Sequence, residues 1–151
     1  MISDSVSARP IVVTHEEGLR FSAQVRSHTI LTDQPERAHG NDDGPTPIEL
    51  LGAALGSCIA LYVQQFCQVR DLPFEGMKVE VRQQNESNPS RVGKFCVRLV
   101  MPEELPPQYA LLLGKVARSC PVHNTLLHGA GIAIDIVSPI GKTLTTATPN
   151  A

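Results

Sequence analysis

Two cysteines carry the most specific chemical signal in this sequence of 151 residues. Cys58 lies in an uncharged run from Leu50 to Val63, and Cys120 lies directly before Pro121. A thiolate that attacks an oxidant becomes a sulfenic acid, and a second thiol within reach condenses with it to a disulfide. The two thiols could do this chemistry if they lie on helices that pack together. Taken alone, Cys58 is more simply explained as a small packed side chain.

The other two cysteines fit structural roles better. Cys67 is nine residues from Cys58, about half a turn out of phase on a helix at ~100° per residue, so we expect it to pack on the other side. Cys96 alternates with the apolar residues Phe95 and Val97. It therefore lies on the opposite face of a predicted strand, and we assign it no chemical role.

A metal site could be formed by Cys120, His123 and His128. Their spacing is not one of the usual paired-ligand patterns for zinc, and histidines in a loop are more often simply solvated. We therefore predict no metal site.

A reactive thiolate needs a positive charge or hydrogen-bond donors beside it. Three arginines that precede Cys58 could supply the charge, namely Arg20, Arg26 and Arg37. The sequence pattern alone does not choose among them.

The segment around Cys58 is predicted to be a helix. Thr46 is a candidate N-cap, Pro47 fits the first helical position, and Glu49 completes a Thr-x-x-Glu capping box. The apolar and small residues that follow lie on every side of this helix, which is typical of a buried helix. We expect it to be too short and too interrupted by glycine and serine to span a bilayer.

Composition places the chain among ordinary globular proteins. Its length suggests one domain over residues 1–151, with mobile tails at about 1–9 and 139–151. The net charge of −2 and the absence of Trp give no reason to expect nucleic acid or a membrane as partner. Residues 1–7 lack the pattern of a secretory signal, so we expect a cytoplasmic protein with free cysteines.

Hydrophobic patterning predicts an α+β fold, with a mainly antiparallel sheet and two main helices. Alternating residues predict strands, with a polar hairpin connection at 83–93 and a loop at 33–44. A second helix opens at Pro106–Pro107 and ends at Cys120, because the residue before a proline is disfavoured in the α region. The predicted strands are 10–14, 19–26, 28–32, 77–82, 94–101 and 132–136.

Two motifs resemble the OsmC/Ohr family. They are Gly-Pro-Thr-Pro-Ile-Glu-Leu-Leu-Gly-Ala-Ala-Leu-Gly-Ser-Cys, which ends at Cys58, and Ala-Arg-Ser-Cys-Pro-Val-His-Asn, which contains Cys120. The resemblance extends from about Leu19 to Ile136. It implies an OsmC-like α+β fold and an intertwined homodimer with active sites at the subunit interface.

The resemblance also implies a function. Well-known members of the family reduce organic hydroperoxides with a cysteine pair and without a bound cofactor, and a dithiol such as a lipoylated protein recycles them. Carried over, Cys58 is the peroxidatic thiol and Cys120 the resolving one, in defence against oxidative stress. The family's activating arginine corresponds best to Arg37, and next best to Arg20.

One residue departs from the family pattern. Peroxidase members carry a glutamate directly after the proline of an Asn-Pro-Glu segment, whereas Ile48 follows Pro47 in this chain. Glu49 lies one position later, about 100° further round the helix. We include Glu49 among the candidate site residues, although its capping-box role explains it sufficiently. The alternative function is a non-catalytic, binding or redox-sensing protein on the same fold.

Overall fold

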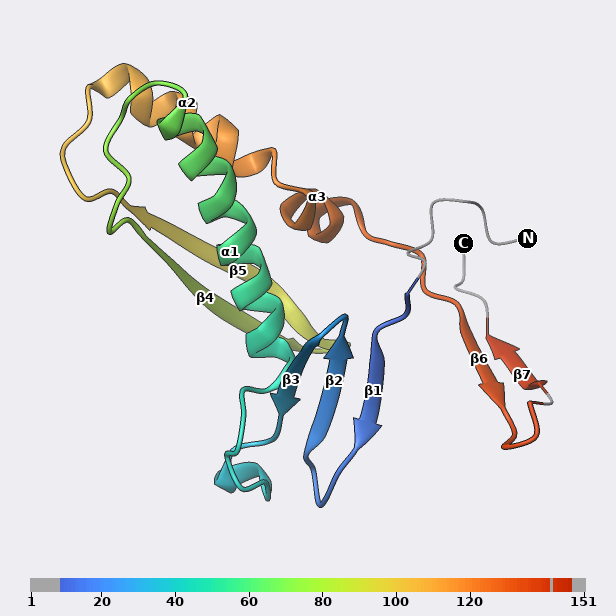
Figure 1. The fold of residues 1–151 in the computed structure, drawn as a ribbon. Coiled ribbons are helices and arrows are strands. Elements are labelled where there is room, and N and C mark those ends of the chain that lie inside the picture. The colour runs from blue at the N-terminus through green and yellow to red at the C-terminus, as the bar shows by residue number, and fades with distance from the viewer. Residues whose placement is uncertain (1–8, 142, 148–151) are drawn as a thin grey trace. The chain divides into compact units, whose positions relative to one another are not determined.

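A computed structural model describes residues 9–141 and 143–147 and confirms the predicted α+β fold (Figure 1). The described strands form three separate antiparallel sheets, and three α-helices accompany them. The chain divides into two compact units. One contains the chain up to Gly56 together with Glu80–Arg98, and the other contains Ser57–Val79 together with the chain from Leu99 onward.

The first unit begins with an antiparallel meander of β1 (Val12–His15), β2 (Phe21–Val25) and β3 (His28–Thr32). These strands confirm the first three predicted strands, with β1 and β2 starting two residues later than expected. Thr14 pairs with Ser22, and Ser22 pairs in turn with Leu31. The expected tail at 1–9 falls almost entirely outside the described residues.

Asp33 organises the loop that follows β3, a role that we did not predict. Its buried carboxylate accepts hydrogen bonds from the backbone N–H groups of Gln34 at 2.7 Å, Asn41 at 3.0 Å and Asp43 at 3.2 Å. Burial by itself would raise the pKa of Asp33, but these three donors outweigh it and hold the pKa below its ordinary value. The carboxylate thereby ties together the two ends of the loop.

Helix α1 (Pro47–Gln68) begins with the predicted capping box. The Thr46 N–H donates to Glu49 Oε2 at 2.7 Å, and the Glu49 N–H donates to Thr46 Oγ1 at 3.3 Å. The Thr46 hydroxyl also donates to Glu49 Oε2, at 2.9 Å. Donors at the first turn of a helix lack partners within the helix, so this reciprocal pair fixes where α1 starts.

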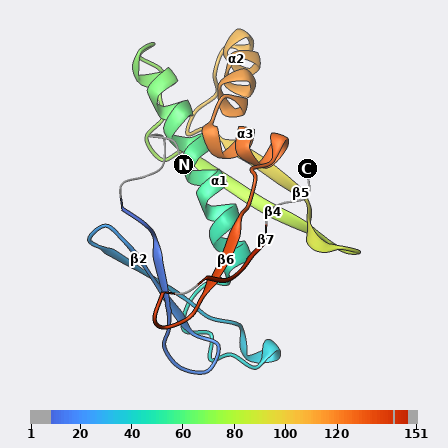
Figure 2. The ribbon, with the colours of Figure 1, turned by 90° about the vertical axis from the view of Figure 1, so that its right-hand side faces the viewer.

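The first half of α1 lies beside the hairpin of β4 (Lys78–Ser87) and β5 (Ser90–Val100) in both views (Figure 1, Figure 2). A Cβ atom on Gly52 would lie 3.7 Å from Val81 and 3.8 Å from Phe95. The glycine therefore lets the helix approach the apolar face of the hairpin. Both strands are longer than predicted, and the predicted 83–93 connection shortens to Asn88 and Pro89.

Only one stripe of α1 is buried within the chain. Its buried residues recur at helical spacing and are Gly52, Leu55, Gly56, Ile59, Val63 and Cys67. Ala53, Ala54, Ser57 and Leu61 are exposed, and Leu61 keeps 50% of its surface accessible. The expectation that this helix is buried all round is therefore wrong for the single chain.

Helix α1 is long and apolar enough to span a bilayer, although we expected it to be too short. It has 22 residues, and by length and composition it could cross a membrane, with 33% of its most apolar window buried. One such helix is weak evidence, because the core helix of a soluble protein meets the same criterion.

In the second unit, the C-terminal half of α1 contacts α2 (Pro107–Arg118), where the Phe66 and Tyr109 rings meet edge to face with centroids 6.5 Å apart. Helix α2 ends at Arg118, two residues before the predicted end. Cys120 is extended, with φ −67° and ψ 136°, as expected of a residue before proline. It serves as the N-cap of α3 (Pro121–His128), a helix of eight residues.

Two strands end the described chain. Strand β6 (Ile134–Val137) overlaps the last predicted strand, and β7 (Thr143–Ala147) pairs with it antiparallel. We expected a mobile tail at 139–151 and missed β7. Its sequence is rich in threonine, a β-branched residue that favours strands, and this signal could have revealed it. The prediction of a single domain stays a prediction.

Candidate active site

The structure brings Cys58 and Cys120 together within the second unit. Cys58 lies midway along α1 and is partly exposed, whereas Cys120 is fully buried, with 0% of its surface accessible. The Cys58 thiol lies close enough to Cys120 to raise the pKa of the Cys120 thiol, and both cysteines are free rather than bonded as a disulfide. Helices α1 and α3 thus present one accessible and one inaccessible sulfur to each other.

The environment of the Cys120 thiol changes its pKa in two opposite directions. Burial raises its pKa most strongly, and the nearby Cys58 thiol adds to the rise in pKa. The backbone N–H groups of His123 and Val122 act to lower the pKa, and the His123 N–H donates to Cys120 Sγ at 3.3 Å. The net direction is upward, so the free Cys120 is a protonated thiol at neutral pH.

The N–H groups beside Cys120 follow from its position as an N-cap. The first N–H groups of a helix have no partners within the helix, and an N-cap side chain can accept hydrogen bonds from them. Pro121 supplies the helical first position without an N–H, so the donors come from Val122 and His123. Sequence reasoning identified Cys120 but not this capping role.

The other two cysteines, Cys67 and Cys96, are not part of this pair. Cys67 is fully buried on α1, where burial raises the pKa of its thiol, as its predicted packing role requires. Cys96 is exposed on β5. In the described ranges, no group of three His, Cys, Asp or Glu side chains is placed to hold a metal ion.

The predicted charged residues Arg20, Arg37 and Glu49 belong to the first unit. Arg20 Nη1 donates to Asp43 Oδ2 at 2.8 Å, and Arg20 Nη2 lies 3.9 Å from Glu17 Oε2. The hydrogen bond with Asp43 raises the pKa of Arg20. The Arg20 guanidinium is therefore already engaged by two carboxylates, those of Asp43 and Glu17.

Arg37 is exposed in a short 3-10 turn, η1 (Glu36–Ala38). Within the described residues its guanidinium makes no ion pair shorter than 4.0 Å. The pKa of Glu49 is lowered mainly by the hydrogen bonds from Thr46, and the charge of Arg37 adds to this effect. Arg37 thus stays available for another partner, while Glu49 is engaged in capping α1.

Several solved structures share the fold of this chain. A protein from Psychrobacter arcticus 273-4, named for a response to osmotic stress and detoxification, is 23% identical, with a TM-score of 0.74 over 83% of this chain and 91% of its own. An OsmC-like protein from Mycoplasma pneumoniae is 17% identical, with a TM-score of 0.65 over 80% of this chain and 89% of its own. An organic hydroperoxide resistance protein OsmC from Legionella pneumophila is 14% identical, with a TM-score of 0.58 over 80% of this chain and 91% of its own.

A search among curated protein sequences gives no match. The sequence pattern of the OsmC-like protein family, in contrast, matches residues 40–136, which include both Cys58 and Cys120. The match covers well over half of the 151 residues. On this evidence, the chain belongs to the OsmC-like protein family.

Proposed function

We propose that this protein is a thiol-dependent peroxidase that reduces organic or lipid hydroperoxides through Cys58 and Cys120. The observation that carries the proposal is the proximity of the two thiols, one partly exposed and the other fully buried. A disulfide requires two Cα atoms within about 7 Å. Two free thiols that lie beside each other on α1 and at the start of α3 need little movement to form one.

The proposed reaction begins at Cys58, because only this member of the pair is accessible from solvent. Its thiolate attacks one peroxide oxygen of ROOH, the O–O bond breaks, and the alkoxide takes up a proton and leaves as ROH. The product on Cys58 is a sulfenic acid. The sulfur of Cys120 then attacks the sulfur of Cys58, and the sulfenic oxygen leaves as water.

The buried Cys120 suits the resolving role. Burial raises its pKa, which keeps it a thiol until the sulfenic acid forms beside it. The N–H groups of His123 and Val122 then stabilise the charge that develops on its sulfur as the proton leaves.

An external dithiol, for which a lipoylated protein is a candidate, would reduce the disulfide. We infer that it attacks the Cys58 sulfur, since Cys120 has no accessible surface. Cys120 is then the leaving thiolate, and the two N–H donors stabilise it. No bound cofactor enters this cycle.

Arg37 is our candidate for the group that activates Cys58, with Arg20 second. A planar guanidinium can contact a sulfur and a peroxide oxygen together, which lysine cannot imitate. Arg20 already donates to Asp43, whereas Arg37 has no ion pair within the described residues. This difference favours Arg37.

We further propose a cytoplasmic homodimer. Exposed apolar side chains occur on most elements of the single chain, including Leu61 on α1, Leu111 on α2 and Leu127 on α3 at 50%, 77% and 66% exposure. Soluble monomers seldom expose apolar surface on this scale. A second copy of the chain would cover it.

The function is tested by mixing the reduced protein with a stoichiometric amount of an organic hydroperoxide. We expect one equivalent of hydroperoxide to be consumed with loss of two thiols, and catalytic turnover when a lipoyl dithiol is added. Dithiothreitol serves as the comparison reductant. A Cys58→Ser variant should consume none.

The alternative is a binding or redox-sensing protein without peroxidase turnover. The engagement of Glu49 in the capping box favours it, because the family's active-site glutamate is replaced here by Ile48. Disulfide formation without catalytic consumption of hydroperoxide would support this alternative and contradict the peroxidase.

A further inference from the structure

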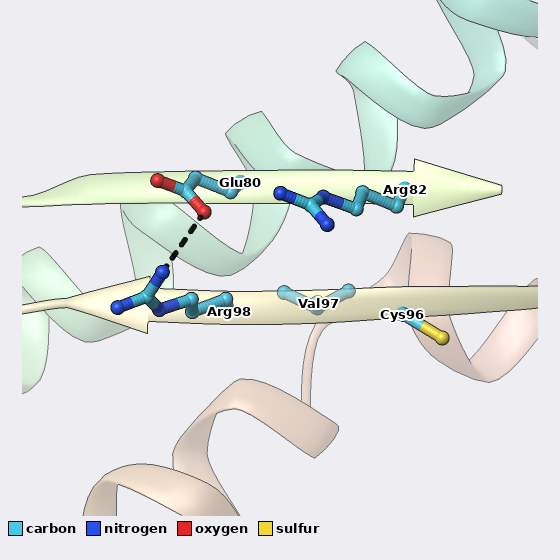
Figure 3. A pocket seen from close by; sticks show the side chains of 5 residues that line it. All are labelled: Glu80, Arg82, Cys96, Val97 and Arg98. Carbon is cyan, nitrogen blue, oxygen red and sulfur yellow. Dashed lines mark ion pairs between the residues drawn. The ribbon is translucent and has the colours of Figure 1, made fainter.

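The hairpin of β4 and β5 carries a pocket lined mainly by charged side chains. The pocket has a volume of about 190 Å³, and its walls belong to the first unit (Figure 3). Val81 and Phe95 face Gly52 of α1, so Glu80, Arg82, Cys96 and Arg98, which alternate with them, point away from the helix, whereas Val97 shares the register of Phe95. The lining residues are Glu80, Arg82, Cys96, Val97 and Arg98.

The charges of this pocket favour an anion. Arg98 Nη1 lies 3.7 Å from Glu80 Oε2, and the two side chains are 75% and 44% exposed. An exposed ion pair at this distance contributes little and is easily exchanged for another. Arg82 makes no ion pair with any residue in the described ranges. The pocket thus offers one unneutralised guanidinium and one loosely paired guanidinium.

Cys96 adds a nucleophile to the same pocket. Its thiol is free and exposed, and it lies on β5 two residues from Arg98, while Arg82 reaches the pocket from β4 (Figure 3). An accessible thiol can exchange with a disulfide, and access is one of the factors that set the rate. The buried Cys67 and Cys120 lack this accessibility.

We propose that Cys96 is a site of thiolation by small disulfides that carry carboxylate groups. Arg82 and Arg98 bind the carboxylates, since a guanidinium matches a carboxylate with two parallel hydrogen bonds. Cys96 loses its proton to solvent, and its sulfur attacks one sulfur of the incoming disulfide. The S–S bond of the reagent breaks, a new S–S bond joins Cys96 to one half, and the other half leaves as a thiolate that takes up a proton. This chemistry goes beyond the proposed peroxidase and does not use Cys58.

The test compares a dianionic with a neutral disulfide at Cys96 in the reduced whole protein. The probes are 5,5′-dithiobis(2-nitrobenzoate) and 2,2′-dithiodipyridine, and peptide mapping of quenched samples follows Cys96 separately from Cys58. Each rate is divided by the rate of the same probe with N-acetylcysteine. We expect the ratio of anionic to neutral rates to exceed one, and to fall towards one when salt is raised to about 0.5 M.

Substitutions locate the effect in the pocket. Arg82→Gln should lower the normalised ratio about threefold, the size of an exposed ion pair, and adding Arg98→Gln should lower it about tenfold. The control is Arg91→Gln, which removes the same charge from the same hairpin outside the pocket, where Arg91 pairs with Glu86. With glutathione disulfide as the reagent, the rates of Cys96 modification should rank the variants in the same order.

The neutral probe reports whether a variant keeps the pocket open, so an unchanged neutral rate excludes misfolding as the cause. A wild-type ratio of one or less would overturn the proposal. An equal loss in Arg91→Gln and Arg82→Gln would overturn it as well, because the effect would then be the general charge of the hairpin. Neither result bears on hydroperoxide turnover at Cys58, so the two proposals fail independently.

Discussion

The backbone N–H of His123 donates a hydrogen bond to the sulfur of Cys120 at 3.3 Å, while the same sulfur is in contact with Cys58. The N-terminus of α3 therefore points its donors at the buried member of the thiol pair. A cysteine at an N-cap next to a second cysteine is an arrangement in which a disulfide can form and be reduced without large movement of either helix.

Mild oxidation should join Cys58 to Cys120 and leave the other two cysteines free. The contact between these two thiols is the physical reason, since Cys67 is buried at another position on α1 and Cys96 lies in the other unit. Peptide mapping after denaturation and alkylation measures the pairing. Finding Cys67 or Cys96 in the main disulfide would show that this assignment is wrong.

The two thiols of the pair should differ in their native reactivity. In Cys120→Ser, Cys58 should react with an alkylating reagent at least about tenfold faster than Cys120 does in Cys58→Ser, because Cys58 is accessible whereas Cys120 is buried and burial raises the pKa of its thiol. Mass spectrometry of timed samples gives both rates. Equal rates in the two single variants would contradict the order of steps that we propose.

Arg37→Lys should slow hydroperoxide reduction by at least about tenfold, which corresponds to about 1.4 kcal/mol in the barrier. The reason is that lysine keeps the charge but loses the planar pair of donors. Arg20→Lys is the matched comparison and should have a smaller effect, because Arg20 is engaged by Asp43. Stopped-flow oxidation of Cys58 measures the rate. If both variants react like the wild type, the peroxidase proposal loses its activating group.

Two substitutions of Glu49 distinguish a structural role of its side chain from a catalytic one. Glu49→Gln keeps an oxygen that can accept from Thr46, so we expect an unchanged melting temperature. Glu49→Ala should lower the melting temperature by a few degrees through loss of the capping box. Slow turnover in Glu49→Gln with normal stability would indicate that the carboxylate also orients an arginine. Normal turnover in Glu49→Gln would indicate that the only role of the Glu49 carboxylate is to cap α1.

Asp33 should make stability depend on pH in the acid range. Its pKa in the folded state lies below the unfolded value, so its contribution is complete above the unfolded pKa and is lost as pH falls through the folded one. Asp33→Asn should lower the melting temperature at pH 7, and the difference from wild type should shrink below about pH 4. Asp42→Asn, an exposed position in the same loop, is the control and should show neither effect.

The proposed dimer makes a prediction about the exposed face of α1. Light scattering at micromolar concentration should give a particle of twice 16.3 kDa, and Leu61→Asp should shift it towards one chain, because a charge cannot be buried unpaired at an interface. Gln68→Glu adds a charge at the end of the same helix and should leave the dimer intact. A wild-type particle of 16.3 kDa would exclude the dimer.

Both the local structure around the site and the family could be predicted from the amino-acid sequence. Its clearest success is the α1 start, where Thr46, Pro47 and Glu49 make a reciprocal cap that depends only on residues three apart. The alternating residues of β2 and β3 are equally local. The motifs around Cys58 and Cys120 were enough to identify the family, which the match over 40–136 then showed.

Which side chains lie next to each other could not be predicted from the sequence, because it depends on how the chain folds. The contact of Cys58 with Cys120 joins positions far apart in the chain, and it depends on how α1 packs in its unit. The convergence of three N–H groups on Asp33 depends on how a whole loop closes. The pocket of Arg82, Cys96 and Arg98 depends on how two strands pair. Short-range patterns describe the conformation of a segment, whereas burial and charge at a site come from segments that fold onto one another, and no local pattern specifies those contacts.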